Sequence, residues 1–263
     1  MKRSTWSAVV ALALLGSSLA YFYWPSPEVD PPPPVTVVPP ESPAPLVAEP
    51  AVRHPLTIAP EATPLPSLNE SDGPFLKAVA ELLGKRWMAI FHNYDVIHRL
   101  VVTIDNLPRK QMSSSNVPLR SVPRAFATEG KGESLAIAPS NASRYAGYAK
   151  LAEALDATRL ADLYFRFYPL FQKAYDELGY PNAYFNDRLV EAIDDLLAAP
   201  EPVAPIKLIE PDVLYKFADP ELEARSAGQK IMLRMGRDNA VKIKAKLREI
   251  RQFLVRGPEK SPG

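Results

Sequence analysis

The chain has 263 residues, 47% of them hydrophobic, which is enough for one domain with a sizeable core and additional extensions. Its formal net charge of +1 provides no bulk attraction to nucleic acid or to another strongly charged partner. The chain contains no cysteine, which excludes disulfides, thiolate metal sites, a cysteine nucleophile and a lipid-modified N-terminal cysteine.

The N-terminal segment predicts a single membrane-spanning helix. Two basic residues precede an uncharged run, residues 6–24, which is close to the roughly 20 residues that cross a bilayer. Trp6 at one end and Tyr21 and Trp24 at the other lie where interfacial aromatic residues are common. The positive-inside rule then predicts a cytoplasmic tip and an exported remainder. The alternative is a cleaved signal peptide, with residues 18–20 as the cleavage sequence, but the apolar run is longer than a usual signal core.

Residues 25–66 predict a disordered, proline-rich tether. This segment holds about half of the 29 prolines of the chain and shows neither helical nor alternating hydrophobic spacing. Such a composition favours extended polyproline II and cannot bury a core. At about 3.1 Å per residue the tether would reach at most about 130 Å. It is either a plain spacer or a docking site for a proline-binding module.

Residues 67–256 predict one mainly α-helical, bundle-like domain with minor β hairpin and strand elements. Helices are expected over residues 72–84, 86–105, 140–154, 156–178, 182–199, 226–235 and 238–255, a glycine-turn hairpin over 124–137, and short strands over 205–208 and 213–217. A helical turn should follow Asp219-Pro220, since the side chain caps and the proline enters the first turn. Residues 257–263 are expected to form a frayed tail.

The helices expected over 156–178 and 182–199 are the centre of this domain. Asp156 is a suitable N-cap for the first, and Pro169 inside it should kink or split it. Gly179 favours the left-handed conformation that ends many helices, and the short connection predicts an antiparallel helical hairpin. The densest aromatic cluster of the chain lies here and forms either core or a ligand groove lined by tyrosines; it comprises Tyr164, Phe165, Phe167, Tyr168, Phe171, Tyr175, Tyr180, Tyr184 and Phe185.

Candidate chemistry is sparse, because the sequence has no phosphate-binding glycine motif, nucleophile elbow or paired-histidine zinc motif. Asp187 and Glu191 are weak catalytic candidates, since two carboxylates can act as acid and base. With Asp194 and Asp195 they could instead ligate a divalent cation or form a solvated acidic face. The sequence therefore predicts no metal site and no cofactor, and it offers no catalytic residue beyond the weak candidates Asp187 and Glu191.

The last helix is basic, and it carries Lys242, Lys244, Lys246, Arg248, Arg251 and Arg256. Basic helices can bind nucleic acid or anionic lipid. An exported domain rarely meets nucleic acid, so we expect no nucleic-acid partner. A solvated face or an internal partner for the acidic helix is the expected role of these residues.

Polar residues at the boundaries of the expected elements are the candidate binding residues. They are Asp105, Asn106 and Arg109 at one helix end, Asn186, Asp187 and Arg188 in the first turn of another, and Gln229, Lys230 and Arg234 in a helix bounded by glycine. The alternative role for all nine is helix capping and hydrogen bonding between helices.

Several phrases resemble a known bacterial family, namely Leu65–Asp72, Val102–Arg109, Tyr184–Leu197, Phe217–Glu223 and Ser226–Gly236. Along residues 65–255 the chain is similar to an uncharacterised, membrane-anchored proteobacterial family known only as a domain of unknown function. The resemblance implies a Gram-negative envelope protein. It implies no activity, cofactor or catalytic residue.

Together these features predict a single-pass protein of the bacterial inner membrane whose globular domain lies in the periplasm. We expect a binding or scaffold module, anchored through residues 6–24, that contacts another envelope protein or peptidoglycan. The alternative is a periplasmic hydrolase that acts on cell-wall glycan through the carboxylates of the helix over 182–199.

Overall fold

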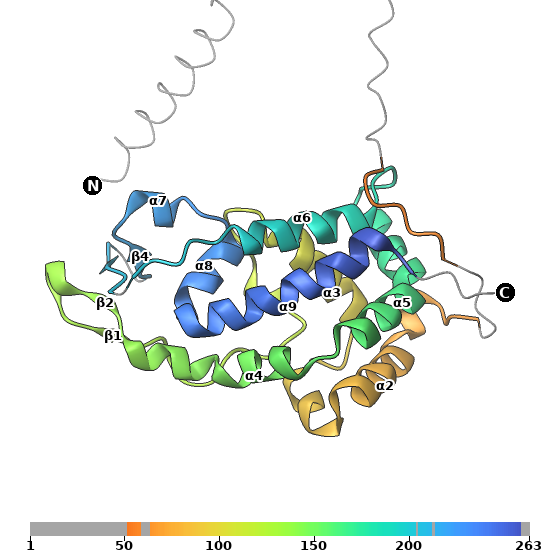
Figure 1. The fold of residues 1–263 in the computed structure, drawn as a ribbon, viewed down its shortest axis with the longest axis horizontal. Coiled ribbons are helices and arrows are strands. Elements are labelled where there is room, and N and C mark those ends of the chain that lie inside the picture. Colours follow the sequence, from red (N-terminus) through yellow and green to blue (C-terminus); the bar gives the residue numbers. More distant parts are fainter. Residues whose placement is uncertain (1–51, 59–63, 204, 212–213, 259–263) are drawn as a thin grey trace, which may run out of the picture. The chain divides into compact units, whose positions relative to one another are not determined.

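Helices dominate the part of the chain that the structure, a computed structural model, describes: residues 52–58, 64–203, 205–211 and 214–258 (Figure 1). The α-helices are α2 (Asp72–Leu83), α3 (Val96–Asn106), α4 (Ala146–Ala154), α5 (Ala157–Glu177), α6 (Phe185–Leu197), α7 (Pro220–Glu223), α8 (Ala227–Arg234) and α9 (Arg237–Arg256). The 3₁₀ helices are η1 (Leu68–Glu70), η2 (Lys85–Ile90), η3 (Ser114–Asn116), η4 (Gly132–Ser134) and η5 (Pro139–Arg144). The predicted fold class, mainly helical with minor β structure, is confirmed for these residues.

The predicted membrane anchor lies outside the described residues, as do most of the tether and residues 259–263 of the tail. Among the helices that the structure describes, none is long and apolar enough to cross a bilayer.

Two small antiparallel hairpins interrupt the helices; the sequence predicts the first as a hairpin and the second only as two short strands. Strand β1 (Thr128–Glu129) pairs with β2 (Ala136–Ile137), and β3 (Leu208–Ile209) pairs with β4 (Lys216–Phe217). A bridge between Ala136 and Lys207 joins the two hairpins. The glycine turn of the first hairpin is required, because Gly130 has a φ of 76° and an added Cβ would lie 2.3 Å from the carbonyl oxygen of Ser134.

The long helices pack around α9, which contacts α4, α5, α6 and α8 (Figure 1). Helix α3 packs against α5 and α6, and α2 packs against α5. The predicted aromatic cluster is largely core. Phe167 and Phe185 are fully buried, Phe75 meets Phe167 edge-on at 5.2 Å, and Phe171 stacks on Phe185 at 5.6 Å. Buried rings from α2, α5 and α6 therefore fix these three helices relative to one another.

The single helix predicted over residues 86–105 is wrong. Residues 85–90 form η2, and α3 begins only at Val96. Asp95 has a φ of 54°, in the left-handed region, which interrupts the helix. The carboxylate of Asp72 accepts hydrogen bonds from the backbone N–H groups of Asp95 (2.7 Å) and Val96 (2.8 Å). A side chain of α2 therefore satisfies donors at the start of α3, which the sequence around 95 does not indicate.

Helix α5 is continuous through Pro169 and does not split there. Pro169 lies on the exposed side of α5, where solvent can satisfy the carbonyl that loses its partner, while the buried side holds the helix in the core. Asp156 caps α5 as predicted and accepts the N–H of Arg159 at 3.1 Å. The helix expected over 140–154 consists instead of η5 followed by α4, and Ser140 does not cap it.

Residues 52–58, which the sequence assigns to the tether, lie against the helical domain and are called the strap below. The side chain of Asn186 donates to the carbonyl oxygen of His54 at 2.9 Å, and Asp187 accepts the backbone N–H groups of Arg53 and His54. Leu56 and Ile58 pack against the aromatic core. The strap therefore contributes both hydrogen bonds and apolar contacts to the domain.

Helix α8 holds the segment that follows α3. Its first N–H groups, those of Ala227 and Gly228, donate to the carbonyl oxygens of Arg109 (2.7 Å) and Leu107 (2.9 Å). Gly228 permits this approach, because an added Cβ would lie 2.7 Å from Leu196 Cδ2 and 3.2 Å from the Leu107 oxygen. The close contact fixes the backbone from which the Arg109 side chain extends.

We expect Gly228→Ala to destabilise the domain by about 1–3 kcal/mol, the usual cost of inserting a methyl group into a packed contact. Gly147→Ala is the matched control, because it lies in α4 with nothing within 4 Å of an added Cβ. There alanine should stabilise by up to about 1 kcal/mol through its higher helix propensity. Denaturant unfolding of the full chain measures both. Equal stability of the two variants would contradict the close approach of α8.

Candidate functional site

A pocket of about 280 Å³ lies where the end of α3, the first turns of α6, the α5–α6 connection and the strap meet. It is lined by Arg53, Asp105, Arg109, Tyr175, Tyr180, Ala183, Tyr184, Asp187, Arg188 and Glu191. Five of these are residues that the sequence analysis proposed for binding or catalysis. They come from two stretches about eighty residues apart, and the packing of α3 against α6 brings them together.

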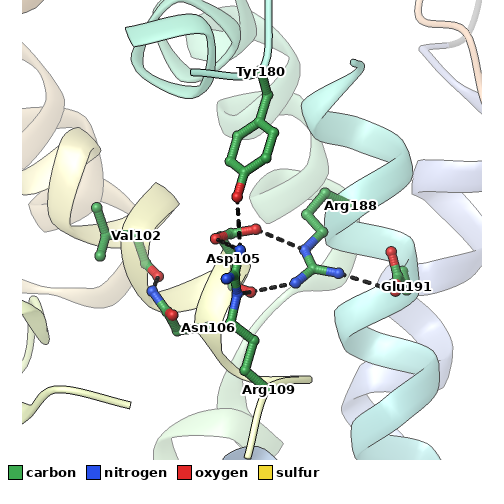
Figure 2. A network of polar contacts seen from close by, with 7 residues as sticks. All are labelled: Val102, Asp105, Asn106, Arg109, Tyr180, Arg188 and Glu191. Atoms are coloured by element: carbon green, nitrogen blue, oxygen red, sulfur yellow. Dashed lines mark hydrogen bonds and ion pairs between the residues drawn. The ribbon is translucent and has the colours of Figure 1, made fainter. Parts of the chain in front are cut away.

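The carboxylate of Asp105 is the centre of the polar network in this pocket (Figure 2). Its side chain is only 7% exposed. One oxygen accepts from Arg188 Nε at 3.0 Å and the other from Arg109 Nη2 at 2.7 Å. A buried carboxylate costs several kcal/mol unless it is paired, and the two guanidinium groups provide this pairing.

The two arginines also close the C-terminal end of α3. The backbone carbonyl oxygen of Asp105 accepts from Arg188 Nη2 and, at 3.3 Å, from Arg109 Nε. The last carbonyl groups of a helix lack intrahelical partners and carry a partial negative charge, so cations are favoured there. Each arginine therefore contacts the helix end and the side chain of Asp105 at the same time.

Arg188 continues the network along α6, where its Nη1 lies 3.0 Å from Glu191 Oε1. All three of its nitrogen atoms thus have a partner, and the side chain is only 15% exposed. Glu191 is 47% exposed, and its second oxygen has no partner among the described residues. Figure 2 shows Arg188 between Asp105 on one side and Glu191 on the other.

Two of the three guanidinium nitrogens of Arg109 have partners. Its Nη2 donates to the hydroxyl of Tyr180 at 2.7 Å as well as to Asp105, and its Nε donates to the Asp105 carbonyl. The hydrogen bond to Tyr180, followed by the charge of Asp105, raises the pKa of Arg109 above its ordinary value. Nη1 has no partner among the described residues. The side chain is 47% exposed and lines the pocket, so a ligand can reach this nitrogen.

Tyrosine rings form the less polar wall. Tyr175 and Tyr180 stack with their centroids 4.8 Å apart. Burial raises the pKa of Tyr175 to about 12, so this hydroxyl is neutral at physiological pH. Tyr184 is 44% exposed at the edge of the pocket. These three rings line the pocket, and Tyr175 also belongs to the buried core together with the other six rings of the cluster.

Asp187 faces the strap. Its two oxygens accept the backbone N–H groups of Arg53 (2.9 Å) and His54 (2.7 Å). These bonds place Arg53 in the pocket lining, while its guanidinium group has no partner among the described residues. Asp187 is thus fully hydrogen-bonded, and Arg53 brings an available positive charge to the same pocket.

Two other predicted binding residues have structural roles beside the pocket. Asn186 is completely buried and bonds to Tyr164 at 3.3 Å, to the His54 carbonyl and to the Leu254 carbonyl. Asn106 donates to the carbonyl of Val102 at 2.7 Å, within its own helix. Neither lines the pocket.

The predicted residues of α8 do not belong to this site. Gln229 donates to the Asp195 carboxylate and carbonyl, both at 2.9 Å, and fastens α8 to α6. Lys230 pairs with Glu223 at 2.6 Å. Arg234 lies over the ring of Phe217 at 5.5 Å and lines a separate pocket of about 370 Å³.

The acidic side of α6 is not a purely solvated face, because two of its carboxylates have partners in other helices. Asp194 pairs with Arg251 of α9, and Asp195 accepts from Ser226 Oγ at 2.6 Å. This supports the interpretation that the basic helix is an internal partner of the acidic one. Within the described ranges, no three histidine or acidic side chains are grouped to hold a metal ion.

The sequence analysis missed Arg53 and Ala183 as pocket residues and gave no role to Tyr180 beyond the aromatic cluster. Arg53 had no usable signal, because it lies in a proline-rich stretch with no periodicity. Tyr180 gave a weak signal of a pocket residue. It is a large ring in a short turn, where a side chain is less easily buried than in a helix.

A family model described as "Protein of unknown function (DUF3014)" matches residues 96–251, which is more than half of the chain. The matched range contains every pocket residue except Arg53. This confirms the resemblance to a family known only as a domain of unknown function. No curated protein and no solved structure matches the chain.

We expect Asp187→Asn to loosen the strap, because the amide has one acceptor oxygen where the carboxylate has two. Hydrogen exchange of the peptide that covers residues 52–58 should accelerate by about tenfold or more, the effect of losing one charge-assisted hydrogen bond. Asp162→Asn on the exposed side of α5 is the control and should change nothing in this peptide. Unchanged exchange in Asp187→Asn would show that the strap is held by other contacts.

Proposed function

The chain belongs to the DUF3014 family of unknown function, and we propose that it is a binding module of the bacterial envelope whose ligand site is the pocket around Asp105, Arg109 and Arg188. In this proposal residues 6–24 anchor the chain in the inner membrane, residues up to the strap form a tether, and the helical domain lies in the periplasm. The charged and apolar pattern of the N-terminal segment supports the anchor.

One observation carries the binding role: the pocket has free donors but few free acceptors. The oxygens of Asp105 and Asp187 are all hydrogen-bonded within the domain, as described above. Arg109 Nη1 and the guanidinium group of Arg53 have no partner in the described part of the chain. A ligand that supplies acceptor oxygens, above all a carboxylate, accepts hydrogen bonds from these donors.

The same observation disfavours the alternative of a glycan hydrolase. A carboxylate that acts as acid or base must reach the substrate proton directly or through one water. Both oxygens of Asp187 are bonded to the strap, and Glu191 is paired with Arg188. Asp187 therefore holds the strap and Glu191 shares one oxygen with Arg188 of its own helix, and this arrangement supports recognition better than proton transfer.

We expect a photoreactive amino acid at Tyr184, on the edge of the pocket, to crosslink to an envelope component in growing cells that express the full chain. Tyr94 is the control position, because it is 54% exposed but does not line the pocket. The Tyr184 adduct should decrease when Arg53→Gln is added, since this change removes a pocket charge without removing a hydrogen bond within the described residues. Identical adducts at both positions, or an adduct indifferent to Arg53→Gln, would contradict the proposal.

A further inference from the structure

We propose that the ligand of this pocket is the end of a peptide, with its free carboxylate against Arg109 and Arg53 and an ammonium group against Glu191. This inference rests on the proposed binding function and names the chemical class of its ligand. It follows from four properties of the pocket: its charge balance, its free hydrogen-bonding atoms, its size and the tyrosine rings that line one side of it.

The pocket is electrically balanced, which argues against a polyanion. Three arginines and three carboxylates line it, so their formal charges cancel. A site for phosphate-rich ligands would carry an excess of positive charge, because each phosphate contributes one to two negative charges. A ligand with one negative and one positive group keeps the balance.

The free atoms of the pocket lie at two places. Arg109 Nη1 and the Arg53 guanidinium group are donors at the side of Asp105 and the strap, and the Tyr180 hydroxyl, which accepts from Arg109, keeps its own proton to donate. The second oxygen of Glu191 is an acceptor beyond Arg188. Arg188 separates the two places, with one nitrogen toward Asp105 and another toward Glu191 (Figure 2). A carboxylate fits the first place and an ammonium group fits the second.

The size of the pocket limits the ligand to a small group. Its volume of about 280 Å³ is below the roughly 300–1,000 Å³ of pockets that enclose drug-sized molecules. A chain end of one or two residues fits this volume better than a disaccharide does. The rings of Tyr175, Tyr180 and Tyr184 provide an apolar surface for the aliphatic part of such residues.

The test is a calorimetric titration of the full-length chain with four probes. Acetyl-Lys-Ala carries both groups, acetyl-Ala-Ala only the carboxylate, the C-terminal amide of acetyl-Lys-Ala only the ammonium group, and inorganic phosphate is the anion without a peptide. We expect acetyl-Lys-Ala to bind about threefold more tightly than acetyl-Ala-Ala, the effect of one exposed ion pair. Its amide should bind at least about tenfold more weakly, because the carboxylate meets two guanidinium groups.

Variants separate the two halves of the ligand. Glu191→Gln should abolish the threefold advantage of the lysine side chain, whereas Glu177→Gln, the same change on an exposed residue of α5 outside the pocket, should keep it. Arg53→Gln should weaken both carboxylate probes several-fold, and Arg248→Gln on the exposed side of α9 should weaken neither. The Arg53 variant loses no hydrogen bond within the described residues, so its effect reports on the ligand.

The outcomes distinguish this inference from the proposed function. Binding of phosphate but of no dipeptide would overturn the inference of a peptide end and leave an anion site. Equal binding of the acid and the amide would also overturn it, because the carboxylate would then contribute nothing to binding. Binding of no probe would overturn both. The source of the peptide follows from replacing L-alanine by D-alanine: a preference for the D form indicates cell-wall stem peptides, and a preference for the L form indicates a protein C-terminus. Either preference supports the inference that the ligand is the end of a peptide.

Discussion

The ion pairs of the buried Asp105 carboxylate are the interaction on which the site depends. Asp105 lies at the end of α3, and two arginines from different parts of the chain must meet there to compensate its charge. Arg188 comes from α6 and Arg109 from the segment after α3, so the same contacts join the two elements and orient both guanidinium groups. Every guanidinium nitrogen of Arg188 has a partner, whereas Nη1 of Arg109, which lines the pocket, has none among the described residues. A structural requirement, the pairing of a buried charge, thereby produces an ordered donor for a ligand.

Two neighbouring contacts keep this arrangement in place. Helix α8 approaches closely at Gly228 and holds the backbone carbonyl of Arg109 with its first N–H group. The strap is fastened by Asp187 and brings Arg53 to the same pocket. The strap is also the described part of the chain nearest in sequence to the proposed tether.

Much of the fold was predictable because its signals are local. Asp156 caps α5 as predicted, and the aromatic residues of α5 do form core. The break before α3 was not predictable, because Asp72 supplies its cap from another helix. For the site, Asp105, Arg109, Asp187 and Arg188 were identified as separate boundary residues, and Asp187 and Glu191 as weak catalytic candidates. Their convergence depends on helix packing, and the part played by Arg53 depends on a segment whose composition suggested only a spacer.

The central claim is that Asp105 fixes both guanidinium groups while leaving Nη1 of Arg109 free for a carboxylate. NMR of the arginine side-chain nitrogens in the full-length chain tests this most directly, with the exposed Arg248 as the reference. The account predicts restricted rotation for Arg109 and Arg188, and shifts at Arg109 Nη1 but only small ones at Arg188 when acetyl-Lys-Ala is added. Free rotation of both groups, or shifts at Arg188 without shifts at Arg109, would contradict it.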